Sequence, residues 1–150
     1  MTEVSFYHLE RSSLDSALPK LLEKVLSANL RAVVKLGSPE RVEALNALLW
    51  TYEPGAFLPH GSGADGHGAS QPIWLTVGDD NPAGATVLIL ADGAQSDRMA
   101  GFERCLEMFD GADPAALAAA RAHWKAYKEQ GFALTYLRQS AAGGWEKQDI

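Results

Sequence analysis

Residues 113–137 read DPAALAAARAHWKAYKEQGFALTYL, a run whose composition predicts a helix followed directly by a strand. Asp113 is a typical helix N-cap, and Pro114 suits the first helical position because an N–H there has no partner within the helix. The alanines that follow have high helix propensity, and a glycine marks the point where the helical run stops. We therefore predict a helix over 113–130 and a strand over 132–137.

The chain before this run alternates strand-like and helix-like segments. Residues 4–9 and 32–36 are short and β-prone, which indicates strands. Each is followed by apolar residues spaced three and four apart, in one helix starting near Asp15 and another capped by Ser38 with Pro39 first. The first half is therefore predicted to fold as strand, helix, strand and helix.

The segments in the middle of the chain carry weaker signals. Residues 73–77 and 85–90 are β-rich and flank a turn-like run at 78–82, which predicts two adjacent strands. Residues 102–109 fit the spacing of a helix and of a strand, so periodicity does not decide between them. Residues 51–72 are rich in Gly, Pro, Ser and His and are predicted to form a long surface loop.

Length and composition predict one domain, because 150 residues with 47% hydrophobic content suffice for a single core. We expect a single α/β domain over 1–138, a sandwich with a largely parallel or mixed sheet flanked by helices. Residues 139–150, with Gly143 and Gly144 in their middle, are predicted to be a flexible C-terminal tail.

The charge balance limits the possible partners of the chain. A formal net charge of −6 argues against tight, non-specific binding to nucleic acid, so any basic site must be local. Cys105 is the only cysteine and cannot form an internal disulfide. The first residues do not resemble a secretory signal, and no apolar run reaches the roughly 18 residues of a membrane span. We therefore expect a cytoplasmic protein without a membrane role.

The motifs suited to catalysis or cofactor binding are weak. Gly61–Gly66 matches the dinucleotide-binding glycine pattern, but a strand follows it instead of the helix whose N-terminus would receive a pyrophosphate. His60, Asp65 and His67 lie in the same loop and could ligate a metal, although glycine-rich chain favours solvated histidines. A nucleotide-binding enzyme that uses this loop remains an alternative. We predict no catalytic residue, no cofactor and no metal.

Two clusters are candidates for binding a partner protein. Arg121, Trp124, Lys125 and Lys128 share one helical stripe, and spacing alone does not distinguish an acidic-peptide site from an ordinary basic helix end. Trp50, Phe57, Leu58 and Pro59 form an apolar group; core packing is the favoured interpretation, and exposure would make them a partner surface. A generic protein-interaction domain is a further alternative.

Five segments stand out in combination: FYHL at 6–9, ALLW at 47–50, FLPH at 57–60, FERCLEMF at 102–109 and RAHWKAYKEQGF at 121–132. Together, and in this order, they resemble the chi subunit family of bacterial DNA polymerase III. The resemblance extends to about Tyr136. It implies an α/β sandwich with nucleotide-binding-like topology but no phosphate loop, and it favours a strand over 102–109.

The resemblance also implies a function without chemistry. Members of the family act as adaptors in the clamp-loader assembly, binding the C-terminal tail of single-stranded-DNA-binding protein and, elsewhere, the psi subunit. The residues that look like tail-binding positions are Arg121, Trp124, Lys125 and Lys128, with Trp124 replacing the family's tyrosine and a basic position lost near Leu117. Trp50 and Phe57, with Leu58 and Pro59 beside Phe57, resemble positions linked to psi or helicase contact.

Overall fold

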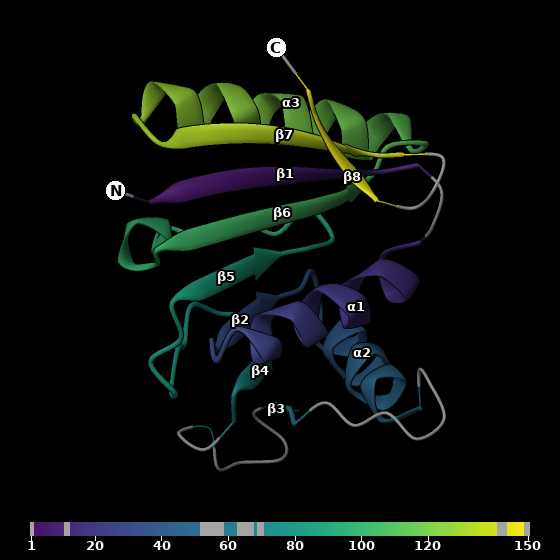
Figure 1. Ribbon diagram of the computed structural model, residues 1–150, viewed down its shortest axis with the longest axis vertical. Helices are drawn as coiled ribbons and strands as arrows, with labels where there is room; N and C mark the ends of the chain where they lie inside the picture. The colour runs from purple at the N-terminus through teal and green to yellow at the C-terminus, as the bar shows by residue number, and fades with distance from the viewer. Residues whose placement is uncertain are drawn as a thin grey trace.

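The computed structural model of the chain describes residues 2–10, 13–51, 59–62, 68, 71–140 and 144–148. Its longer elements alternate between strands and helices along the sequence (Figure 1). They are β1 (Glu3–Leu9), α1 (Leu14–Ser27), β2 (Ala32–Lys35), α2 (Pro39–Thr51), β3 (Gly61–Ser62), β4 (Ile73–Thr76), β5 (Val87–Leu90), the short 3-10 helix η2 (Met99–Gly101), β6 (Arg104–Asp110), α3 (Pro114–Glu129), β7 (Ala133–Gln139) and β8 (Trp145–Gln148).

The described strands form one 8-stranded sheet in the order β3-β4-β2-β5-β6-β1-β7-β8. Every neighbouring pair is parallel except β7 and β8, which run antiparallel. Parallel strands of one sheet need crossover connections, and α1, α2 and α3 each lie in a crossover between two strands that have at least one other strand between them. The predicted α/β fold with a largely parallel or mixed sheet is confirmed.

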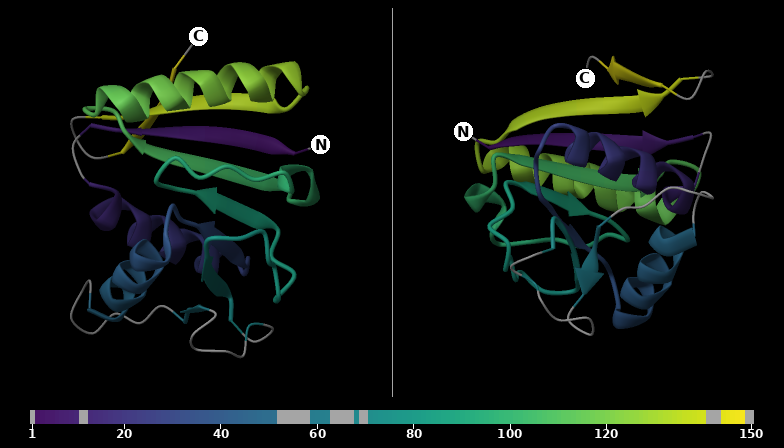
Figure 2. Two further views of the ribbon diagram at one scale, coloured as in Figure 1. Left: turned by 180° about the vertical axis from the view of Figure 1, so that it is seen from behind. Right: turned by 60° about the horizontal axis from the view of Figure 1, so that its bottom comes forward.

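Helices cover both faces of the sheet. In Figure 1 α1 and α2 lie in front, and the rear view in Figure 2 shows α3 on the opposite face. Side chains alternate between these layers along each strand: Phe6 belongs to the core beneath α3, and Tyr7 belongs to the core beneath α1 and α2. The inner strands are therefore buried on both faces, as is usual for a parallel sheet, whereas β7 and β8 are mostly half-buried or exposed.

The local signals for α3 operate as expected. The Asp113 side chain accepts a hydrogen bond of 3.0 Å from the Ala115 N–H, and Pro114 follows in the first turn. Gly131 adopts φ +88, a left-handed conformation that suits glycine, immediately after the helix. The predicted helix and the strand that follows it are confirmed.

Three expectations about the strands need correction. β4 and β5 are not adjacent, because β2 lies between them and pairs with both in parallel. A tight turn joins only antiparallel neighbours, so the turn at 78–82 could not make them a hairpin. The predicted loop at 51–72 contains the short strand β3. The predicted tail contains strand β8, and the ring centroid of its Trp145 lies 4.8 Å from that of Tyr7.

The structure also decides between helix and strand for the segment at 102–109. Residues 104–109 belong to strand β6, and residues 105–109 are buried. These side chains contact both cores, so the segment has apolar residues on both faces of the sheet. A strand buried on both faces lacks the alternation of a surface strand, which explains why periodicity alone did not decide.

Candidate functional site

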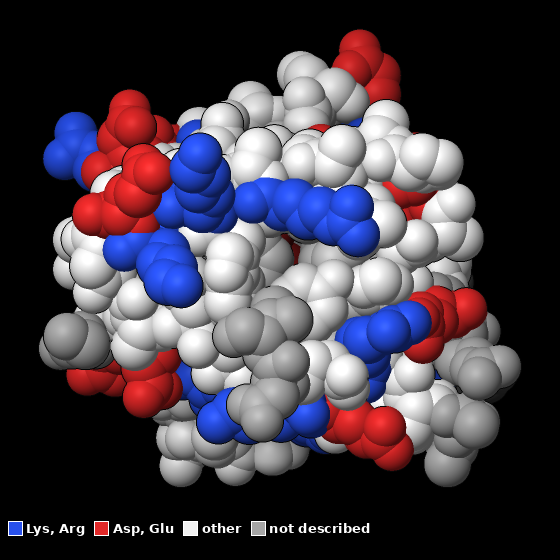
Figure 3. Space-filling model, turned by 90° about the horizontal axis from the view of Figure 1, so that it is seen from above, with Lys and Arg blue, Asp and Glu red and all other residues white. Residues whose placement is uncertain are grey.

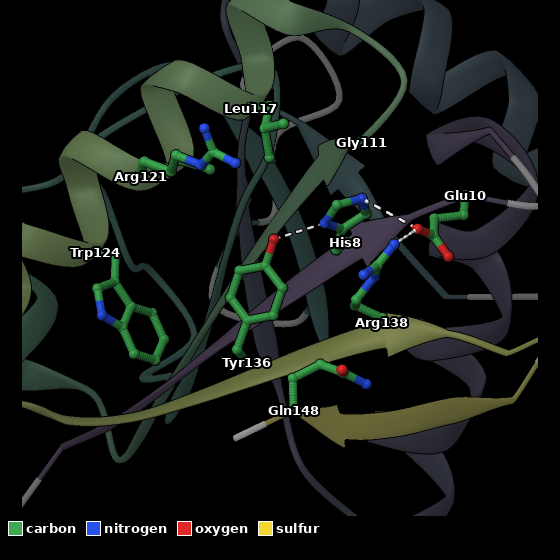
Figure 4. A pocket seen from close by; sticks show the side chains of 10 residues that line it. His8, Glu10, Gly111, Leu117, Arg121, Trp124, Tyr136, Arg138 and Gln148 are labelled. Atoms are coloured by element: carbon green, nitrogen blue, oxygen red, sulfur yellow. Dashed lines mark hydrogen bonds and ion pairs between the residues drawn. The ribbon is translucent and has the colours of Figure 1, made fainter. Parts of the chain in front are cut away.

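A pocket of about 670 Å³ lies beside α3, and its size suits a small ligand or a peptide end. We call it the α3 pocket. Side chains from β1, α3, β7 and β8, and a glycine between β6 and α3, surround it (Figure 4). The lining residues are His8, Glu10, Gly111, Leu117, Ala120, Arg121, Trp124, Tyr136, Arg138 and Gln148.

The helix contributes a cation and an aromatic ring to this pocket. Arg121 is exposed at its rim, and the half-buried Trp124 lies one turn further along the same side of α3. The Trp124 ring packs edge-on against Phe6 at 5.2 Å and Tyr136 at 5.9 Å, measured between ring centroids. This packing orients the indole, so one side of the ring system is core and the other lines the pocket.

The remaining two predicted tail-binding residues are exposed on α3 but do not line the pocket. Lys125 and Lys128 lie further towards the C-terminal end of the helix. Figure 3 looks onto the top of the molecule as drawn in Figure 1, where α3 and β7 lie, and shows Lys and Arg side chains spread across it. Of the four predicted residues, the structure therefore brings Arg121 and Trp124 into one concavity and leaves the two lysines on the surrounding surface.

An uncharged pair forms the middle of the pocket. His8 Nδ1 and the Tyr136 hydroxyl are joined by a hydrogen bond of 2.6 Å. Burial lowers the pKa of His8, and the nearby Arg138 and Arg121 lower that pKa further. Burial also raises the pKa of the Tyr136 hydroxyl. Both side chains are therefore neutral near pH 7, and the charged side chains that line the pocket are Arg121, Arg138 and Glu10.

The close approach of the chain to His8 requires a glycine. A Cβ atom placed on Gly111 would lie 1.9 Å from His8 Nε2, far inside contact distance. The Gly111 N–H also donates a hydrogen bond of 2.9 Å to the Leu9 carbonyl. Gly111 thus holds the start of the α3 crossover against the end of β1, where the pocket forms.

A buried polar cluster anchors the inner side of α3. The Glu107 carboxylate on β6 accepts hydrogen bonds from His123 Nδ1 at 2.8 Å and from the Tyr127 hydroxyl at 3.0 Å. All three side chains are buried, and the hydrogen bond to Glu107 raises the pKa of His123. The inner side of the helix is therefore tied to the sheet while its outer side carries Arg121 and the lysines.

Sequence reasoning missed the lining residues that come from the strands. The β1–β7 register places Phe6 beside Tyr136 and His8 beside Arg138, so all four side chains meet on the α3 face of the sheet. In β1 the available signal was His8, a polar side chain near the end of a strand whose last six residues are buried. Nothing local in the sequence indicated that β7 would be its partner.

The second predicted cluster is described only in part. Trp50 is 57% exposed at the end of α2, and its ring lies 5.0 Å from that of the buried His60. Pro59 is half-buried. Phe57 and Leu58 lie outside the described residues. We call Trp50, Pro59 and His60 the Trp50 edge.

The other side chains considered for catalysis or metal binding have structural roles where they are described. Cys105 is fully buried, and burial raises the pKa of its thiol to about 12. Asp79 pairs with Lys35, and Asp80 accepts a hydrogen bond from the Trp74 indole, so both carboxylates serve the turn that follows β4. Among the described residues, no group of three His, Cys, Asp or Glu side chains could hold a metal ion. Asp65 and His67 lie outside that part of the chain.

Fold and site together define a mostly parallel α/β protein with a local, basic and aromatic surface pocket. Within the described residues, no helix combines the length and apolarity needed to cross a membrane. Residues 1–135 match the family described as DNA polymerase III chi subunit, HolC, and the chain belongs to that family.

A curated relative supports this assignment. The chain is 37% identical over 90 residues to a protein of Rickettsia prowazekii (strain Madrid E) named "Probable DNA polymerase III subunit chi". The matched region is 60% of this chain and 54% of the relative, so the chain spans about half the length of that protein.

Proposed function

We propose that the chain is a non-catalytic, cytoplasmic adaptor in the clamp-loader assembly of DNA polymerase III, and that its α3 pocket binds the acidic C-terminal tail of single-stranded-DNA-binding protein. One observation carries the proposal: Arg121 and Trp124 line the same concavity beside a neutral His8–Tyr136 pair. On a chain with a net charge of −6, a local basic pocket favours an acidic peptide without general affinity for DNA.

The pocket offers separate contacts for the two chemical features of such a tail. The Arg121 guanidinium suits a carboxylate, since its planar N–H groups can donate two parallel hydrogen bonds. The rings of Trp124 and Tyr136 supply an apolar wall for a terminal phenylalanine. Lys125 and Lys128 attract acidic residues further back along the tail. Each exposed charge pair is worth roughly 0.2–1 kcal/mol, so we expect salt-sensitive binding.

The test is a titration of a tail peptide, with and without its terminal phenylalanine, against wild type and Arg121→Ala. We expect Arg121→Ala to weaken binding about tenfold, because a charge-assisted hydrogen bond is lost. Removal of the phenylalanine should weaken binding to both proteins. Lys125→Ala and Lys128→Ala should each have a smaller effect, since neither side chain lines the pocket.

Lys20→Ala is the matched control, because it removes an exposed cation from α1, which lies on the other face of the sheet. It should bind the peptide as wild type does. Equal affinity of wild type and Arg121→Ala for both peptides would refute the proposal. A nucleotide-binding enzyme would instead be stabilised against heat by its ligand, and we expect nucleotides to leave thermal unfolding unchanged.

We also propose that the Trp50 edge contacts a second partner, either the psi subunit or a helicase. The exposed indole of Trp50 supports this, because a tryptophan 57% exposed on a surface is a typical anchor for a protein partner. Co-purification of clamp-loader components with wild type, but not with Trp50→Ala, is the expected result. Recovery of the same components with both proteins would count against the second surface.

A further inference from the structure

Arg138 and Glu10 form an ion pair on the side of the α3 pocket that lies opposite Arg121 (Figure 4). Arg138 projects from β7, and Glu10 follows directly after the end of β1. The Glu10 carboxylate also lies 3.6 Å from His8 Nε2. Arg138 lies beyond residues 1–135, the part of the chain that matches the family.

The sheet register explains why this arginine reaches the pocket. β1 and β7 are parallel, and His8 stands directly beside Arg138. Residues two apart on a strand share a face, so Arg138 projects on the same face as Tyr136. The two guanidiniums, Arg121 from the helix and Arg138 from the strand, therefore approach the neutral His8–Tyr136 pair from opposite sides. An acidic ligand in this pocket meets a cation at either side.

We propose that Arg138 is a second carboxylate-binding residue of the α3 pocket, and that Glu10 occupies it until a ligand carboxylate takes the place of Glu10. This inference rests on the proposed binding of an acidic tail and identifies a further residue of that site. The argument is chemical: the Glu10 side chain already presents to Arg138 the group that an acidic peptide would bring. The ion pair is accessible to solvent, because the Arg138 side chain is 47% exposed and that of Glu10 28% exposed.

Exchange of one carboxylate for another requires no rearrangement of the fold. Arg138 keeps one carboxylate partner before and after binding, so its guanidinium is paired in both states. Glu10 leaves Arg138 at the end of β1, where its side chain is already 28% exposed to water. The competition makes Glu10 a determinant of affinity, and it selects for ligands with two carboxylates, one for each arginine.

The experiment is a double-mutant cycle on the full chain with Glu10→Gln, Arg138→Ala and the double variant. Binding of the tail peptide is measured at one fixed ionic strength. Glu10→Gln should strengthen binding roughly two- to fivefold, because the competing carboxylate is gone. Arg138→Ala should weaken binding roughly fivefold. In the Arg138→Ala background, Glu10→Gln should not increase affinity for the peptide, because Glu10 competes with the peptide only for Arg138.

Glu129→Gln is the matched control, because it removes an acidic side chain from the exposed end of α3, outside the pocket. It should leave affinity within about twofold of wild type. An equal gain from Glu10→Gln in both backgrounds would mean that Glu10 acts only through general charge, and the proposal would be overturned. Wild-type affinity of Arg138→Ala would overturn it as well.

A second peptide separates this inference from the proposed function. It is an unrelated acidic peptide that ends in phenylalanine and has the same charge as the tail. If wild type binds this peptide but not the tail, the proposed function fails, and the cycle is still measured on the unrelated peptide. If the tail binds wild type more tightly than Arg121→Ala while the double-mutant cycle shows no coupling between Glu10 and Arg138, only the inference about Arg138 fails. Binding of neither peptide overturns both.

Discussion

The α3 pocket and the Trp50 edge differ in how much of the fold each requires. Side chains from four elements line the pocket, and its two arginines come from helix α3 and strand β7. The Trp50 edge consists of one exposed indole at the end of α2, with His60 beside it and Pro59 next to His60 in the chain. Substitutions near the pocket should therefore alter folding and binding together, whereas substitution of Trp50 should affect only a partner.

The largest expected effect comes from the anchor beneath α3. His123→Ala leaves the buried Glu107 carboxylate without its His123 hydrogen-bond partner, and removing one partner of such a buried pair costs about 3–5 kcal/mol. Denaturant unfolding should show a loss of this size in the free energy of unfolding. Tail-peptide affinity should fall as well, since Arg121 and Trp124 are carried by the same helix. A loss below about 1 kcal/mol would show that α3 is held by its apolar contacts alone.

Gly111 gives the next effect, at the edge of the pocket. Gly111→Ala places a Cβ 1.9 Å from His8 Nε2, so the imidazole or the backbone must move, at a cost of about 1–3 kcal/mol. The same movement should disturb the His8–Tyr136 hydrogen bond and weaken peptide binding. Gly101→Ala is the control, because a Cβ there meets nothing within 4 Å. Similar unfolding free energies for the two variants would contradict the close packing of Gly111 against His8.

The two histidines near α3 should respond to pH with opposite signs. The pKa of His123 is raised from 6.5 by its hydrogen bond to Glu107, so the folded protein binds its proton more tightly than the unfolded chain. The resulting stabilisation is fully present below pH 6.5 and is lost as the pH rises through the raised pKa. The effect is smaller than that of His123→Ala, because a neutral imidazole can still donate a hydrogen bond to Glu107.

His8 follows the reverse rule. Its pKa is lowered by burial and by Arg138 and Arg121, so the unfolded chain binds the proton more tightly. Stability is therefore lost as the pH falls below the ordinary value of 6.5. The unfolding free energies of wild type, His123→Gln and His8→Gln should be measured at pH values on both sides of 6.5. The difference between wild type and His123→Gln should fall with rising pH, and the difference between wild type and His8→Gln should rise. Parallel slopes would contradict the two assignments.

The same contrast explains what could be predicted from the sequence. The α3 helix was predictable because its cap, its alanines and its terminal glycine act within the segment itself, and the i, i+3 spacing placed Arg121 and Trp124 on one side. The opposite wall was not predictable, since His8 and Arg138 meet only through the register of two strands far apart in the chain. Strand β8 was missed because Trp145 is the only apolar residue in its WEKQ sequence.

Trp50→Ala should have the smallest effect on the isolated protein. An exposed side chain contributes little packing, so the free energy of unfolding should change by no more than about 0.5 kcal/mol. Affinity for the tail peptide should stay within about twofold of wild type, because Trp50 does not line the α3 pocket. Denaturant unfolding and the same peptide titration measure both quantities. A loss of stability near that of Gly111→Ala would mean that Trp50 has a structural role. Loss of a co-purifying partner by Trp50→Ala, with unchanged affinity for the tail peptide, would show that the two surfaces act independently.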